Sequence, residues 1–131
     1  MTPSQPPPPP ADRLRLLLVD DEPKLLDALR EGLAADFEVE TAGSAAEAEK
    51  LMAAREFAVV ICDHILPGEA GLDFLMRMRE LHPQTRRILL TGYMNPELLS
   101  RSVAMAELSA CLIKPVRASG LARAARDAMQ S

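Results

Sequence analysis

Five polar residues stand directly behind apolar runs, and their types suit phosphate chemistry. They are Asp20 and Asp21 behind LRLLLV, Asp63 behind AVVIC, Thr91 behind RILL, and Lys114 behind ACLI. Carboxylate oxygens are ligands for Mg²⁺, which often binds one or two carboxylates together with a substrate phosphate. A carboxylate can also attack phosphorus, while a hydroxyl and an ammonium group contact the phosphoryl oxygens. Brought together, these residues could support magnesium-assisted phosphoryl transfer onto an aspartate.

The charge of this set calls for a cation. Three carboxylates carry about −3 at neutral pH, and one lysine returns about +1. Two like charges 4 Å apart repel by roughly 4 kcal/mol at an effective dielectric constant near 20. A bound Mg²⁺ would make the site nearly neutral. Because an aspartate nucleophile is already ionised, it needs no general base, and neither His64 nor His82 is required.

The chain alternates apolar runs with helical patterns, which would bring these residues to one edge of a sheet. Strands are predicted at residues 13–19, 37–42, 58–62, 87–90 and 110–113, and helices at 23–35, 44–55, 71–81, 96–108 and 118–129. Continuous apolar runs are typical of parallel strands that helices cover on both faces. We predict an α/β fold with a doubly wound five-stranded parallel sheet and five helices. Two strand orders are common for such sheets, and we predict the flavodoxin-like order 2-1-3-4-5. The ligand crevice of such a sheet lies at the carboxyl ends of strands 1 and 3.

Local signals mark several element boundaries. Pro23 suits the first turn of a helix, and Ser44 with Glu47 matches the Ser-x-x-Glu capping box. Asn95 is predicted to cap the helix that follows it. Residues 65–70 are predicted to form a loop.

Length and composition indicate one globular domain. The chain has 131 residues, of which 48% are hydrophobic and 26% charged, and its net charge of −4 argues against a nucleic-acid-binding surface. Residues 1–12, with an unbroken proline run, are predicted to be a disordered tail. Cys62 and Cys111 are predicted to be buried, reduced thiols. No segment resembles a signal peptide or a membrane span, so a cytoplasmic location is expected.

Four segments, in order, resemble the receiver domains of two-component response regulators, the family that includes the chemotaxis regulators. They are VDDEP from Val19, VVICDHILPGEAGLDFL from Val59, LLTGY from Leu89 and LIKPV from Leu112. The resemblance covers about residues 13–129 and implies a receiver domain over residues 13–131. It implies that Asp63 is the phosphoacceptor, and that Pro67 and Gly71 match the proline and glycine that follow it.

The resemblance also implies a metal shell and a switch. Mg²⁺ would be held directly by Asp21 and Asp63, by the main-chain carbonyl of Ile65, and through a water by Asp20. Thr91 matches the switch hydroxyl. Lys114 matches the lysine that precedes a proline, here Pro115, in a bond that is often cis. Cys111 stands where the family usually has an aromatic residue, which places the aromatic half of the switch in doubt.

Partners follow from the same resemblance. The phosphoryl donor would be a histidine kinase or a histidine phosphotransfer protein, and the downstream target would be a protein. The chain is expected to be a stand-alone receiver without turnover of an external substrate, and without nucleic-acid or membrane partners. Helix 4, strand 5 and helix 5 are the expected partner face and possible homodimer interface, with basic residues Arg101, Arg117, Arg123 and Arg126.

Two other functions are compatible with parts of the pattern. A haloacid-dehalogenase-type phosphatase would need a second carboxylate two positions after Asp63, where Ile65 stands. A receiver fold that acts only as a binding module, independent of phosphorylation, is favoured by Cys111 alone.

Overall fold

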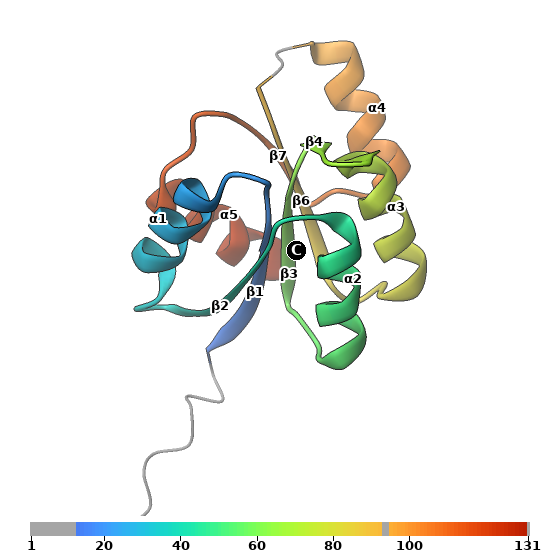
Figure 1. Ribbon diagram of the computed structural model, residues 1–131. Helices are drawn as coiled ribbons and strands as arrows, with labels where there is room; N and C mark the ends of the chain where they lie inside the picture. The colour runs from blue at the N-terminus through green and yellow to red at the C-terminus, as the bar shows by residue number, and fades with distance from the viewer. Residues whose placement is uncertain (1–12, 93–94, 131) are drawn as a thin grey trace, which may run out of the picture.

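Five parallel strands form the central sheet of the computed structural model, which describes residues 13–92 and 95–130. They are β1 (Leu14–Val19), β2 (Phe37–Ala42), β3 (Val59–Asp63), β6 (Arg86–Thr91) and β7 (Ala110–Ile113). Their spatial order is β2-β1-β3-β6-β7 (Figure 1). Counted along the chain, this is the predicted order 2-1-3-4-5, so the predicted topology is confirmed.

Helices cover both faces of the sheet. They are α1 (Pro23–Leu33), α2 (Ala45–Ala54), α3 (Gly71–Leu81), α4 (Pro96–Ala106) and α5 (Ala118–Gln130). Helices α1 and α5 lie on one face, and α2, α3 and α4 lie on the other (Figure 1). Alternate residues of β1 enter two separate cores: Leu16 and Leu18 pack with the α1 and α5 side, Leu17 and Val19 with the opposite side. The apolar runs were continuous because both strand faces are buried.

The helix starts largely follow the sequence signals. Pro23 occupies the first turn of α1, and Asn95 Oδ1 accepts a hydrogen bond from the Glu97 N–H at 3.1 Å. Ser44 Oγ accepts from the Glu47 N–H at 3.2 Å. The Glu47 carboxylate accepts from the N–H of Gly43 at 3.1 Å, one residue before the cap. The capping box is therefore present in a shifted form, with its reciprocal bond outside the cap residue.

We expect Ser44→Ala to lower the free energy of unfolding by about 1 kcal/mol, because it removes the side-chain acceptor at the start of α2. Urea denaturation should show an earlier midpoint with an unchanged slope. Ser109→Ala, at an exposed serine, is the matched control. Equal midpoints for the two variants would contradict the stabilising role of this cap.

Residues 65–70 are not a plain loop, so that prediction is wrong. Ile65–Leu66 (β4) pairs antiparallel with Glu69–Ala70 (β5), and Pro67 and Gly68 make the turn between them. Gly68 has a φ of +85°, and a proline followed by a glycine with positive φ is the type II turn pattern. The Pro-Gly pair was the signal of this short hairpin.

Helix α4 ends at Ala106, two residues earlier than predicted. Glu107 adopts a φ of +47°, which leaves the helical region. Arginine side chains from outside the helix bind the carbonyls at its end: Arg79 Nη1 donates to Met105 O at 3.0 Å, and Arg87 Nε donates to Ala106 O at 2.8 Å. These donors satisfy carbonyls that a helix end otherwise leaves unpaired.

Some expectations fall outside this description. The predicted tail at residues 1–12 lies outside the described residues. Within residues 13–92 and 95–130, no helix combines the length and apolar character needed to cross a bilayer.

Candidate functional site

The structure brings the acidic residues and the lysine together at the carboxyl edge of the sheet. One carboxylate oxygen from each of Asp20, Asp21 and Asp63 lies within 4.8 Å of the others. Lys114 Nζ lies 2.9 Å from Asp20 Oδ2 and 3.1 Å from Asp63 Oδ1. Thr91 is the last residue of β6, the strand between β3 and β7. The predicted clustering follows from a parallel sheet, because all its strands end at the same edge.

The carboxylates differ in their burial. Asp20 is 2% exposed and Asp63 is 9% exposed, whereas Asp21 is exposed. Asp20 is held from two directions, since its Oδ1 also accepts from the N–H of Glu22 at 3.0 Å. Asp21 has the accessible oxygen atoms that a direct ligand of an incoming ion needs. The geometry is thus consistent with a fixed inner carboxylate and a free outer one.

The electrostatics of the site are dominated by two buried carboxylates that share one ammonium group. Burial raises the pKa of Asp63 above its ordinary value, and the charge of Asp20 raises it further, although the hydrogen bond from Lys114 opposes this shift. Burial lowers the pKa of Lys114, but the hydrogen bonds to Asp20 and Asp63, together with their negative charges, outweigh burial, and the pKa is raised overall. Lys114 therefore stays charged, yet it does not neutralise the site.

The donor set fits a hard divalent cation. Three carboxylates against one lysine leave a net charge of about −2, and the ligand atoms that the described residues bring together here are carboxylate oxygens. Mg²⁺ accepts one or two carboxylates and keeps several waters, which suits an open site with one exposed aspartate. The residues present therefore fit this ion.

The backbone on the far side of Asp63 is firmly held. The N–H of His64 donates to Leu90 O, and the N–H of Gly71 donates to His64 O, both at 2.7 Å. The hydrocarbon side chain of Ile65 has no ligand atom, so this residue can contribute only its main-chain carbonyl to an ion. A Cβ on Gly71 would lie 1.9 Å from the Asp63 carbonyl oxygen. The resemblance to receiver domains includes this glycine, and the structure explains it, because no larger residue fits so close to the Asp63 carbonyl.

The residues of the expected switch lie on the neighbouring strands β6 and β7. Thr91 is 2% exposed, and its carbonyl accepts from the N–H of Lys114 at 2.8 Å. The Lys114–Pro115 peptide bond is cis, as expected. Cys111 pairs in register with Leu89 and is only half-buried, so the prediction of two buried thiols is correct for Cys62 alone. Burial raises the pKa of the Cys111 thiol, so it remains protonated at neutral pH.

Arg126 does not lie on the predicted partner face. Its guanidinium lies 3.1 Å from Asp36 Oδ2 and sits over the ring of Phe37, 5.3 Å from its centroid. Because α5 packs against α1, this side of α5 points toward β2 rather than toward α4. Arg126 is therefore removed from the set of arginines assigned to that face.

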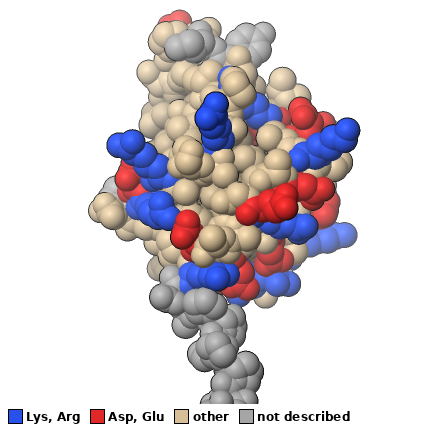
Figure 2. All heavy atoms as spheres, turned by 90° about the vertical axis from the view of Figure 1, so that its left-hand side faces the viewer, with Lys and Arg blue, Asp and Glu red and all other residues tan. Residues whose placement is uncertain are grey.

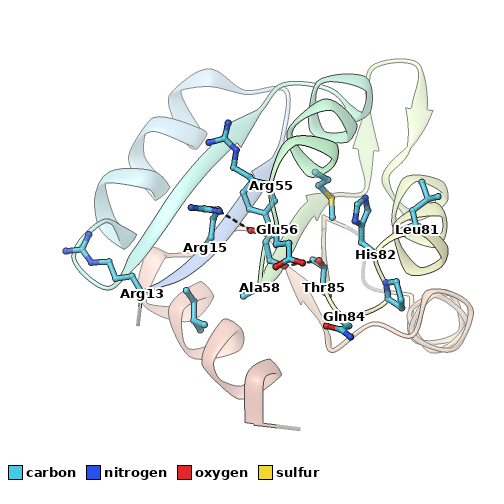
Figure 3. A pocket seen from close by; sticks show the side chains of 13 residues that line it. Arg13, Arg15, Arg55, Glu56, Ala58, Leu81, His82, Gln84 and Thr85 are labelled. Atoms are coloured by element: carbon cyan, nitrogen blue, oxygen red, sulfur yellow. Dashed lines mark hydrogen bonds between the residues drawn. The ribbon is translucent and has the colours of Figure 1, made fainter. Parts of the chain in front are cut away.

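A cavity of about 570 Å³ lies at the opposite end of the sheet and is separate from the acidic cluster (Figure 3). Two of the three arginines in its lining have carboxylate partners: Arg15 lies 3.5 Å from Glu38, and Arg55 lies 3.1 Å from Glu40. On the face covered by α1 and α5, basic and acidic side chains are interspersed around an uncharged centre (Figure 2). This face shows no continuous basic surface of the kind that binds nucleic acid.

Comparisons with known proteins agree with this geometry. Residues 16–126 match the family described as the response regulator receiver domain. A hydrogenase transcriptional regulatory protein, HoxA of Bradyrhizobium diazoefficiens, is 36% identical over 115 residues, which are 88% of this chain and 24% of that protein. The chain therefore spans about a quarter of the length of this relative.

Solved structures are similar over nearly the whole chain. The signal receiver domain of an HD domain-containing protein from Pseudomonas fluorescens Pf-5 has a TM-score of 0.82 and 33% identity, covering 90% of this chain and 95% of that one. A response regulator protein from Burkholderia pseudomallei, with a phosphorylated aspartic acid, a calcium ion and citrate, has a TM-score of 0.79 and 26% identity, covering 89% and 69%. Family match, fold and acidic cluster agree, and the chain belongs to the response regulator receiver domains of two-component systems.

Proposed function

We propose that this receiver accepts a phosphoryl group on Asp63, with Mg²⁺, from a histidine kinase or a histidine phosphotransfer protein. The observation that carries this proposal is Lys114 Nζ, 2.9 Å from Asp20 and 3.1 Å from Asp63, with Asp21 in the same cluster. The known phosphorylated aspartic acid and metal ion of the Burkholderia pseudomallei regulator support the same chemistry here.

Each residue would have a separate task in the transfer. An Asp63 oxygen forms the new bond to phosphorus while the bond to the donor's leaving group breaks, and the leaving group departs with that electron pair. Lys114 and the Thr91 hydroxyl would bind phosphoryl oxygens. Asp21, Asp63 and the Ile65 carbonyl would hold Mg²⁺ directly, and Asp20 would hold it through a water. The bound ion supplies neutralisation of the charge that develops on the phosphoryl oxygens.

The signal would leave the site through Thr91 and Lys114. The Thr91 carbonyl accepts a hydrogen bond from the N–H of Lys114, which directly follows β7. A movement of Thr91 toward the phosphoryl group would therefore displace the end of β7. The expected partner surface is formed by α4, β7 and α5, and on α4 it would include Val103, which is 40% exposed. A protein target, or a second copy of the domain, would bind there.

The proposal predicts one added phosphoryl group per chain after incubation with acetyl phosphate and Mg²⁺, measured by intact-mass spectrometry. Asp63→Asn and omission of Mg²⁺ should each abolish the adduct. Asp127→Asn, at an exposed aspartate of α5, is the matched control and should be phosphorylated like the wild type. An adduct that persists in Asp63→Asn would refute the assignment of the acceptor.

A phosphorylation-independent binding module is the second candidate, and Cys111 is the observation that favours it. The half-buried thiol has neither the bulk nor the hydroxyl group of a tyrosine. A folded wild-type protein that takes no phosphoryl group from acetyl phosphate or from a histidine-phosphorylated donor would favour this function.

A further inference from the structure

Arg77 of α3 connects three separate parts of the protein. Its Nη1 donates to Glu69 Oε2 at 2.6 Å, and its Nη2 donates to Glu69 Oε1 at 2.7 Å. The same Nη2 also donates to Glu49 Oε2 at 3.1 Å. Glu69 belongs to β5 of the hairpin, Glu49 to α2 and Arg77 to α3. One guanidinium thus holds the hairpin against two helices.

This contact differs from an ordinary surface ion pair. Two parallel N–H···O bonds fix both the distance and the orientation of the Glu69 carboxylate. The Arg77 guanidinium also lies over the ring of Phe74, 5.9 Å from its centroid, and Phe74 is fully buried. The hydrogen bonds from Arg77 lower the pKa of Glu69 despite its partial burial, so the pair stays ionised at neutral pH. The hairpin is therefore attached to α3, the helix that carries the buried Phe74.

The hairpin that this fork restrains leads directly from the proposed phosphoacceptor. Glu69 lies opposite Leu66, and Ala70 lies opposite Ile65, in the β4–β5 ladder. The hairpin closes at its base through the bond from the N–H of Gly71 to His64 O. Each strand of the ladder has only two residues, which is too short to be stable without external contacts. Leu66 is buried at 6% exposure and anchors the first strand, and the contacts that hold β5 are a second restraint on the Ile65 main chain.

We propose that Arg77 and Glu69 are positioning residues for the metal site, acting by fixing the hairpin whose first strand carries the Ile65 carbonyl. The inference rests on the proposed function, because the Ile65 carbonyl is a ligand only if Mg²⁺ binds at the acidic cluster. Neither Arg77 nor Glu69 contacts the cluster itself. They would restrict the movement of the Ile65 carbonyl before the ion binds. Groups outside the ligand shell raise the affinity of a site for its metal in this way.

The test is the Mg²⁺ dissociation constant of the unphosphorylated full chain, measured by isothermal titration calorimetry. Arg77→Met keeps the length of the side chain and removes the fork, and we expect Mg²⁺ binding to weaken on the order of tenfold. Glu69→Gln should weaken it similarly, and the double variant should weaken it no further, because both changes break the same contact. Arg79→Met is the matched control, since Arg79 lies on the same helix and pairs instead with Glu107.

A second readout separates positioning from general loss of stability. Amide hydrogen exchange should become faster in residues 65–70 of Arg77→Met, while the strands of the central sheet keep their protection. Unchanged Mg²⁺ affinity in both Arg77→Met and Glu69→Gln would overturn the inference, as would an equal loss in Arg79→Met. If Arg77→Met does not fold, Glu69→Gln alone decides. A wild-type chain that does not bind Mg²⁺ would instead count against the proposed function.

Discussion

Replacing Gly71 with alanine is expected to destabilise the protein by at least about 2 kcal/mol and to displace Asp63. The added Cβ would lie 1.9 Å from the Asp63 carbonyl oxygen and 2.9 Å from its carbonyl carbon. These are backbone atoms at the end of a buried strand, so they cannot rotate away as a flexible side chain could. Relief requires α3 or the end of β3 to move. Because Asp63 is the last residue of β3, either movement changes the site.

Two opposing contributions decide whether Gly71→Ala lowers or raises the free energy of unfolding: the steric clash of the new Cβ and the higher helix propensity of alanine. Alanine is favoured over glycine inside a helix by up to about 1 kcal/mol, which works against the clash. Gly120→Ala in α5 isolates the propensity effect, because a Cβ there meets nothing within 4 Å. Urea denaturation should therefore show Gly120→Ala slightly more stable than the wild type and Gly71→Ala clearly less stable. Equal stability of the two variants would contradict the close approach of α3 to β3.

Gly71→Ala should also separate stability from function. At a temperature where the variant remains folded, phosphorylation by acetyl phosphate should still be slower than in the wild type, since the Asp63 carboxylate no longer points at the shared ammonium group. Intact-mass time courses at matched folded fractions measure this directly. A wild-type rate in the folded variant would mean that the strain is absorbed by α3 alone.

The sheet order and the edge that carries the site could be predicted from the sequence. Continuous apolar runs marked strands buried on both faces, and polar residues stood where those runs end. These features predicted a doubly wound parallel sheet and its functional edge, and the observed order is one of the two common orders for such a sheet. Asp20, Asp63 and Lys114 meet because parallel strands share one carboxyl edge, whatever the side chains between them. The helix starts were predictable for a similar reason, since a cap depends on residues only a few positions apart.

What the sequence did not predict depends on contacts between distant positions. The bond between Arg77 and Glu49 joins residues 28 positions apart, and the bond between Arg87 and Ala106, which helps to end α4, joins residues 19 apart. No local pattern distinguishes these arginines from solvated ones. Likewise, Arg126 was assigned to the wrong face because its helical position does not reveal the packing of α5 against α1. The β4–β5 hairpin was missed for another reason: its two-residue strands are too short to show alternation.

Replacing Lys114 with methionine is expected to slow phosphorylation by acetyl phosphate on the order of a hundredfold to a thousandfold. The variant keeps most of the side chain's length but loses the charge that would bind a phosphoryl oxygen. Mg²⁺ affinity should not fall, and it should rise if anything, because Lys114 and Mg²⁺ neutralise the same carboxylates. This split between transfer rate and metal affinity is the distinguishing result, and Lys50→Met, at an exposed lysine, is the control for both.

Stability without metal gives an independent check of the same variant. Burial already raises the pKa of Asp63, and loss of the Lys114 hydrogen bond would raise it further. When the pKa of a carboxyl group is higher in the folded state than in the unfolded state, ionisation of that group destabilises the folded state. The loss of unfolding free energy in Lys114→Met should therefore be greatest at neutral pH and should become smaller as the pH falls. Added Mg²⁺ should restore much of this lost stability at neutral pH, because the ion replaces the missing positive charge. If Lys114→Met lost Mg²⁺ binding together with transfer, Lys114 would be organising the aspartates rather than binding the phosphoryl group.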